Sequence, residues 1–206
     1  MELARKMILS AQESGVDLVK FQLYDAEDDK GKPHYEWVKK AELTFDQAKM
    51  LFDYGTEVGI EVFFSVFGVK YVKWCQKIGV KRFKIAKCES RNYKLLKAIG
   101  RSVEVIISTD LIIPLSNLDD YYIQWLWCPD SPVKMKLGFK NHQGFSDHTI
   151  GLDAAKIALA RGASIIEKHF VLDREHSQSP EREWSMEPSE LKELKRWENI
   201  CQQVLK

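Results

Sequence analysis

The stretch "GFSDHTIGLDAAKIALARGASIIEKHF", residues 144–170, decides the fold. It opens with a short strand-like segment and continues through apolar residues at helical spacing, which stop at Gly162, a typical helix C-cap. It then returns to a β-branched run that ends in a histidine. Strand, helix and strand in this order form a βαβ unit, so we expect the two strands to lie parallel in one sheet.

The same alternation runs through the rest of the chain. It predicts seven strands, at 16–23, 60–67, 82–87, 103–109, 121–128, 144–149 and 163–171. It also predicts helices at 2–14, 44–58, 69–78, 92–100, 151–162 and 187–205. The first strand lacks the glycine-rich turn of nucleotide-binding doubly wound sheets, and polar residues stand at six separate strand ends. We therefore predict an α/β fold, a TIM-type (β/α) barrel, with residues 1–206 as one domain.

Composition narrows the class of protein. The 206 residues carry a formal net charge of +1, which gives no basic excess for nucleic acid. No apolar run is long enough to span a membrane, and the N-terminus has no signal-peptide pattern. The four cysteines show no zinc-module spacing and fit free thiols in a reducing compartment. We expect a cytoplasmic protein.

Two histidines end neighbouring predicted strands. Side chains alternate along a strand, so Ser146 and His148 share one face, Glu167 and His169 share another, and Lys168 points away. If these strands are neighbours, both imidazoles can reach one metal ion, with positions left for water and substrate. The alternative from spacing alone is a hydrogen-bonded polar layer above the barrel core.

Two lysines, Lys20 and Lys84, lie within apolar strands, where an unpaired charge is costly. They either form structural ion pairs with Glu167 or Glu89, or they bind an anionic substrate. Hydroxyls at strand ends can add hydrogen bonds to such an anion: Ser65, Ser108, Thr109 and Ser146. The remaining histidines, His34, His142 and His176, are expected at the surface.

Several motifs together resemble a known family. The strings "VDLVKFQ", "IEVFFSVF", "FKIAKCE", "NYKLLKAIG", "VIISTD" and "SMEPSEL", with the stretch from residue 144 to 174, resemble the sialic acid synthase (N-acetylneuraminate synthase) family. The resemblance implies a (β/α) barrel that condenses phosphoenolpyruvate with an N-acetylated hexose and releases phosphate. The product is a 2-keto sugar acid, and the cofactor is a divalent metal, Mn²⁺ or Mg²⁺.

The resemblance also implies roles for single residues. His148 and His169 match the family's metal ligands, and Lys20, Ser65 and Ser146 match positions that hold phosphoenolpyruvate. Four residues match positions around the sugar acceptor: Gln22, Lys84, Glu89 and Glu181. Of these we assign Lys84 and Glu89, with His169, to catalysis, and Lys87 to substrate binding.

The chain departs from the family pattern at several places. Lys87 stands where "KIASxE" has a serine, "STGM" reads "STDL" with Asp110, and Glu181 stands where the family has aspartate. The loop after residue 125 reads "LWCPDSP", so Trp127 and Asp130 replace its usual polar pair. We expect the family's first strand with its glutamate, and its C-terminal antifreeze-like domain, to be absent. The short segment after residue 109 also predicts that one outer helix is shortened.

Loss of one strand leaves a barrel with an open seam of unpaired backbone groups, so we expect another copy or a partner chain to cover it. Three functions remain open: an active synthase of altered specificity, a catalytically impaired homologue that binds ligand or regulates, and a different phosphoenolpyruvate- or aldehyde-using barrel enzyme. The acceptor sugar is not fixed by the sequence.

Overall fold

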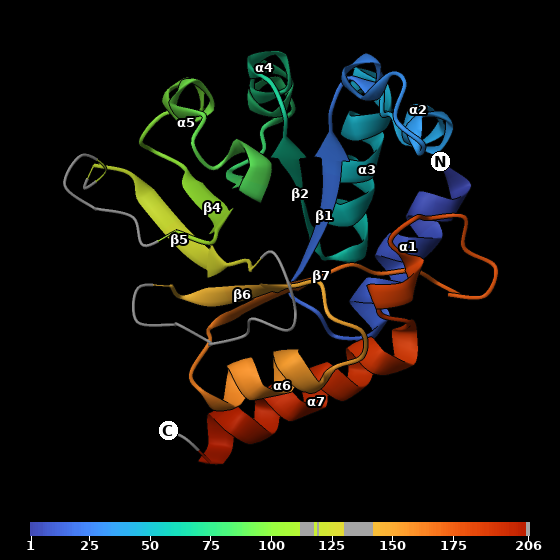
Figure 1. The fold of residues 1–206 in the computed structure, drawn as a ribbon, viewed down its shortest axis with the longest axis vertical. Coiled ribbons are helices and arrows are strands. Elements are labelled where there is room, and N and C mark those ends of the chain that lie inside the picture. Colours follow the sequence, from blue (N-terminus) through green and yellow to red (C-terminus); the bar gives the residue numbers. More distant parts are fainter. Residues whose placement is uncertain (112–117, 119, 130–141, 205–206) are drawn as a thin grey trace.

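Seven parallel strands form one curled sheet at the centre of the molecule (Figure 1). This computed structural model describes residues 1–111, 118, 120–129 and 142–204. The strands pair in chain order, each with the next. They are β1 Leu18–Leu23, β2 Glu61–Val66, β3 Arg82–Ile85, β4 Glu104–Thr109, β5 Tyr122–Trp127, β6 Gly144–Asp147 and β7 Ile165–Lys168. The predicted incomplete (β/α) barrel is confirmed, because the sheet curls without backbone pairing between β1 and β7 in the described part of the chain.

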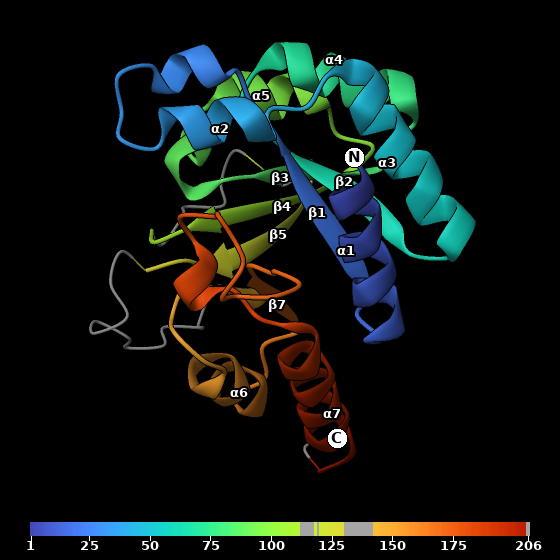
Figure 2. The ribbon, with the colours of Figure 1, turned by 90° about the vertical axis from the view of Figure 1, so that its right-hand side faces the viewer.

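The helices surround the curled sheet on its outer side (Figures 1 and 2). They are α1 Glu2–Glu13, α2 Tyr35–Ala41, α3 Phe45–Val58, α4 Val69–Ile78, α5 Tyr93–Ile99, α6 Asp153–Ala160 and α7 Pro188–Val204. Short 3₁₀ turns lie at Ala26–Asp29, Lys87–Glu89 and Arg182–Trp184. Helix α2 was not predicted. The predicted shortening of an outer helix falls on residues 112–117 and 119, outside the described residues.

Local signals explain where α3 begins and ends. Thr44 and Gln47 form a capping box, in which each side chain accepts a hydrogen bond from the other residue's backbone N–H. Gly59 ends the helix in the left-handed region at φ 80°, which glycine adopts without steric cost. Inside the helix, Gly55 lets the backbone lie close to β2, because a Cβ there would meet Val62 Cγ2 at 2.4 Å.

The main core lies between the outer face of the sheet and the helices. Phe64, Phe83 and Ile107 are strand residues of this core, and each is at most 2% exposed. Under α6 and α7 the core continues with smaller side chains such as Ala155 and Ala158. Within the described residues, no helix is both long and apolar enough to cross a membrane.

The last two strands end one residue before each histidine. β6 stops at Asp147 and β7 at Lys168, so His148 and His169 begin the two loops that leave the C-terminal edge of the sheet. Asp147 and Lys168 are direct partners in the register of these strands. The histidines therefore leave the sheet at the same level, from adjacent strands.

Candidate active site

Glu167 lies at the centre of the polar end of the curled sheet. Its carboxylate is 2.7 Å from Lys20 Nζ and 3.5 Å from Lys84 Nζ. It also accepts hydrogen bonds from Ser146 Oγ at 2.7 Å and from Ser108 Oγ at 3.2 Å. Burial alone would raise the pKa of Glu167, but the charges of Lys20 and Lys84 outweigh it and hold this pKa well below its usual range. The carboxylate is therefore ionised and fixes both lysines.

Lys84 is a buried cation, with only 2% of the residue exposed. Its ammonium donates to Ser108 Oγ at 2.7 Å and to the carbonyl oxygen of Ile85 at 2.9 Å. Burial lowers the pKa of Lys84 to about 8, although the nearby Glu167 charge opposes that change. Both lysines thus pair with Glu167, one of the alternatives that the sequence left open, but one carboxylate is shared by two cations. The remaining positive charge suits an anionic ligand.

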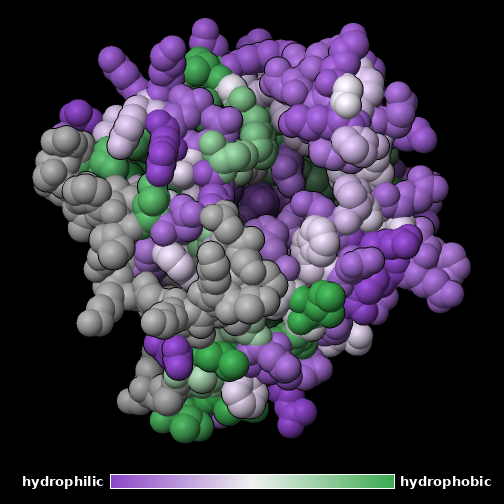
Figure 3. All heavy atoms as spheres, viewed as in Figure 1, coloured by the Kyte–Doolittle hydropathy of each residue, from purple (hydrophilic) through white to green (hydrophobic). Residues whose placement is uncertain are grey.

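Ser65 offers a hydroxyl to this same space. The residue is 1% exposed, and its Oγ has no hydrogen-bond partner among the described residues. In the register of the sheet it is the direct partner of Gln22 on one side and Lys84 on the other. A buried unpaired hydroxyl is costly, so a ligand oxygen at this position would satisfy it. Figure 3 shows a hydrophilic recess near the middle of this face of the molecule.

His148 and His169 lie side by side, with ring centroids 5.2 Å apart. The Nδ1 atom of His169 is 3.1 Å from a carboxylate oxygen of Glu181, and Nδ1 of His148 is 3.8 Å from Cys128 Sγ. Burial lowers the pKa of both imidazoles, that of His169 to about 3. Both rings are therefore neutral at physiological pH, the form that binds metal ions.

This pair fits the divalent metal that the family resemblance implies. Partners on each Nδ1 leave the two Nε2 atoms as the available ligands, and a carboxylate on the far nitrogen is a common support for a metal-binding histidine. In the part of the chain that the structure describes, no group of three or more His, Cys, Asp or Glu can hold a metal ion. The described residues thus offer two neutral imidazoles, which would leave the other coordination positions of such an ion to water and substrate.

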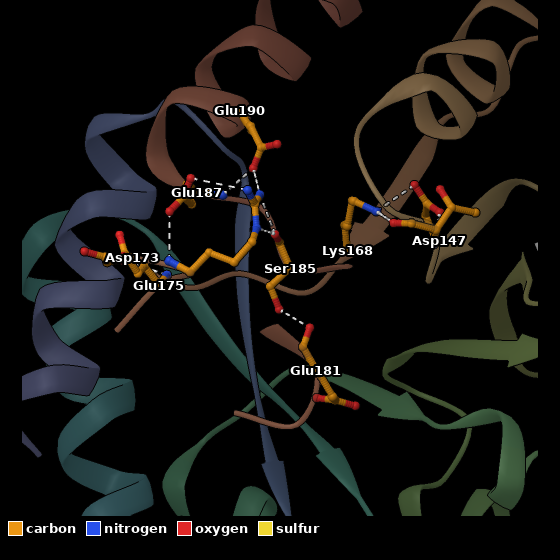
Figure 4. A network of polar contacts seen from close by, with 10 residues as sticks. Asp147, Lys168, Asp173, Glu175, Glu181, Ser185, Glu187 and Glu190 are labelled. Atoms are coloured by element: carbon orange, nitrogen blue, oxygen red, sulfur yellow. Dashed lines mark hydrogen bonds and ion pairs between the residues drawn. The ribbon is translucent and has the colours of Figure 1, made fainter. Parts of the chain in front are cut away.

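Glu181 is held in place by the segment between β7 and α7. Its carbonyl oxygen accepts a hydrogen bond from Ser185 Oγ at 2.8 Å. The guanidinium of Arg174 donates to the carbonyl oxygen of Ser185 at 3.0 Å and pairs with Glu187 and Glu190 at the start of α7. Burial raises the pKa of Glu181. An ion-pair network therefore holds the backbone of Glu181, the residue whose carboxylate lies beside His169 (Figure 4).

Three other predicted site residues lie on or after neighbouring strands. Glu89 lies in the 3₁₀ turn after β3, where its carboxylate accepts a hydrogen bond from Asn92 at 2.7 Å. Lys87, in the same turn, pairs with Asp110 at 3.3 Å, so two departures from the family pattern contact each other. Gln22 is half-buried beside Ser65 in the register. These assignments stay predictions.

Trp127 and His142 pack against each other. Trp127 packs on the outer face of the sheet against the cluster around Phe145, because β5 turns this side chain away from the interior. The prediction that His142 lies at the surface is wrong: it is 9% exposed, and its ring packs against that of Trp127 at 5.3 Å between centroids. Asp130 lies outside the described residues.

Comparison with known proteins identifies the family of this chain. A model of the NeuB family matches residues 7–112 and 133–205. The chain is 30% identical to an uncharacterized protein of Methanocaldococcus jannaschii and 28% identical to N,N'-diacetyllegionaminic acid synthase of Legionella pneumophila. Each alignment covers 94% of this chain, and the chain spans only 64% and 66% of those relatives.

A solved structure shows the same fold. It is the N-acetylneuraminic acid (sialic acid) synthetase of Leptospira borgpetersenii in complex with citrate. The superposition has a TM-score of 0.88 at 28% identity and covers 99% of this chain and 79% of that one. The resemblance inferred from the motifs is confirmed, and the chain belongs to the NeuB family.

Proposed function

We propose that this chain carries the phosphoenolpyruvate and metal site of a synthase that makes a 2-keto sugar acid from an N-acetylated hexose. The observation that carries the proposal is the arrangement at the polar end of the sheet. The buried Lys84, the partly buried Lys20 and the unpartnered hydroxyl of Ser65 adjoin the neutral pair His148 and His169. The first group suits an anion, and the second suits a divalent ion.

The reaction joins carbon 3 of phosphoenolpyruvate to the aldehyde carbon of the sugar. Water adds at carbon 2, the aldehyde oxygen becomes a hydroxyl, and the C–O bond between carbon 2 and phosphate breaks, so the products are a 2-keto acid and inorganic phosphate. A divalent ion such as Mn²⁺ or Mg²⁺ supplies Lewis acidity toward the aldehyde oxygen when it is bound. Lys20 and Lys84 would hold the carboxylate and phosphate of phosphoenolpyruvate, with Ser65 and Ser146 as further donors.

His148 and His169 would hold the metal through Nε2, and Glu181 would keep the ring of His169 in that orientation. Glu181 and Gln22 are proposed to face the acceptor sugar, together with Lys87 and Glu89 from the turn after β3. Residues 1–206 would form a single barrel domain. The panel of acceptors in the test is broad because the two relatives with a named product make different acids, N,N'-diacetyllegionaminic acid and N-acetylneuraminic acid.

The test is phosphate release from phosphoenolpyruvate in the presence of Mn²⁺ and a panel of N-acetylhexosamines. The proposal predicts release that is lost in His169→Ala and retained in His176→Ala, a matched histidine whose side chain is 79% exposed. Absence of release for every acceptor would contradict synthase activity of this chain.

A second function, a homologue that binds ligand without turnover, is favoured by two observations. Glu89 is engaged with Asn92, and Lys87 is paired with Asp110, so two of the four residues assigned near the acceptor have partners within the chain. For such a protein, phosphoenolpyruvate would raise the melting temperature although no phosphate is released. Thermal shift and phosphate release, measured on the same sample, therefore separate the two functions.

A further inference from the structure

A buried ion pair lies directly behind the two histidines. Lys168 Nζ is 3.0 Å from Asp147 Oδ2, and the side chains are 1% and 0% exposed. The two residues are direct partners in the register of β6 and β7. They point to the outer face of the sheet, opposite to Ser146 and Glu167, which contact each other inside. Figure 4 shows Lys168 reaching toward Asp147, apart from Glu181.

The pair also ties down the backbone that carries His148. The N–H of Thr149 donates to Asp147 Oδ1 at 2.8 Å, and Lys168 Nζ donates to the carbonyl oxygen of Thr149 at 2.6 Å. The residues on both sides of His148 are therefore joined to one lysine. That lysine immediately precedes His169 in the chain. One cluster thus links the backbones of both imidazoles.

Stability alone is a poor explanation for this arrangement. Taking two charges out of water is expensive, and apolar residues of similar volume often replace a buried ion pair with no loss of stability. A second ion pair, Arg82–Glu104 at 2.7 Å, links β3 and β4 at the opposite end of the sheet, and its side chains are 23% and 18% exposed. Charges at that end touch no histidine, whereas Asp147 and Lys168 each adjoin one.

We propose that Asp147 and Lys168 are positioning residues, which set the separation of His148 and His169 and so the geometry for a divalent ion. This inference rests on the proposed function for the identity of the bound group. It assigns a role to two residues whose side chains lie on the outer face of the sheet, opposite to Ser146 and Glu167. Loss of residues that orient metal ligands typically lowers metal affinity about 10–100-fold.

The variant that tests the inference is the double substitution Asp147→Asn with Lys168→Met. It removes both charges at once, so that no unpaired charge is left buried, and the amide oxygen of the new side chain can still accept from the Thr149 N–H. We expect a folded protein whose Mn²⁺ affinity, by isothermal titration calorimetry, is about 10–100-fold weaker than that of the wild type. Wild-type affinity in the double variant would overturn the inference.

The matched control is the double substitution Arg82→Met with Glu104→Gln. It removes the ion pair at the opposite end of the sheet, so it can lower the melting temperature but should leave Mn²⁺ affinity unchanged. Lys168→Arg serves as the conservative rescue, because it keeps a donor for Asp147 and for the Thr149 carbonyl. The Mn²⁺ affinity of Lys168→Arg should lie closer to the wild-type affinity than the Mn²⁺ affinity of Lys168→Met does.

A readout without metal separates this inference from the proposed function. Hydrogen exchange of the Thr149 amide should be about tenfold faster in the Asp147/Lys168 double variant, because a neutral amide accepts a weaker hydrogen bond than a carboxylate and no lysine holds the Thr149 carbonyl. It should be unchanged in the Arg82/Glu104 variant. Equal Mn²⁺ binding by the wild type and His148→Ala would contradict the proposed metal site. Exchange at Thr149 would still test whether Asp147 and Lys168 hold the backbone around His148. Unchanged exchange in the Asp147/Lys168 variant would contradict this positioning role, whether or not the protein binds Mn²⁺.

Discussion

Lys20 Nζ lies 2.7 Å from Glu167 Oε1, although these residues belong to β1 and β7, the two edge strands of the seven-stranded sheet. Their backbones do not pair, so side chains join the first and last strands across the interior. The two side chains are 22% and 19% exposed, so the pair is partly shielded from water. The sheet is therefore closed at its polar end by an ion pair rather than by a β-ladder.

Substitution of Lys20 or Glu167 should weaken this closure. Glu167→Gln leaves Lys20 and Lys84 without their counter-charge, so we expect the free energy of unfolding to fall by about 3 kcal/mol. Lys20→Met still leaves Lys84 beside Glu167 and should cost less. A double-mutant cycle read by urea unfolding should give a coupling energy of about 1–3 kcal/mol. Additive effects of the two substitutions would show that the pair does not close the sheet.

Gly144→Ala should destabilise the protein because there is no room for a side chain between β5 and β7. A Cβ at this position would lie 2.3 Å from the carbonyl oxygen of Ile165 and 2.6 Å from Leu126 Cδ2. The backbone of β6 or β7 must then move, which should lower the free energy of unfolding by about 1–3 kcal/mol. Gly68→Ala is the control, since its nearest contact would be Tyr71 at 3.6 Å and only a helix cap is affected. Equal melting temperatures for the two variants would contradict this.

Phosphoenolpyruvate affinity should fall as the pH rises above 8. Burial lowers the pKa of Lys84 to about 8, so its ammonium is present below that pH and is lost above it. An anion binds the protonated form more tightly, and the affinity should therefore decrease toward tenfold per pH unit. Lys84→Met should bind more weakly, with no change between pH 7 and 9. The check is calorimetric titration across this range, and a flat wild-type profile would exclude a role for Lys84.

Self-association should accompany the open edges of β1 and β7. Unpaired edge strands offer hydrogen-bonding groups to another chain, and folded proteins normally cover them. Sedimentation velocity over a micromolar concentration series should therefore show a species larger than the monomer. A strictly monomeric protein across the whole series would contradict this expectation.

The fold was predictable because it follows from local patterns. Alternating strands and helices, with helix ends such as Gly162, placed all seven strands within a few residues of their observed bounds. Helix α2 was missed because Tyr35–Ala41 is short and follows a polar loop, so no apolar period marks it. Most helices of this length depend on tertiary packing, which periodicity does not contain.

The site was predictable only in part. His148, His169, Lys20 and Ser65 could be named because strand alternation and the family resemblance both point to them. Glu167 was predicted only as an ion-pair partner. Its central position could not be predicted, because its four contacts come from four other strands. The pairs Lys87–Asp110 and Asp147–Lys168 were not foreseen, since contacts between residues in, or just after, different strands depend on the register of those strands.

The most direct test of the central claim is calorimetric titration of phosphoenolpyruvate into the protein in the presence of Mn²⁺. Both proposed functions require this binding, so the result does not depend on turnover. The account predicts saturable one-site binding in the wild type, which becomes at least tenfold weaker in Lys20→Met and in Ser65→Val and stays unchanged in His176→Ala. Heats of dilution alone in the wild type, or equal affinity in all four proteins, would contradict it.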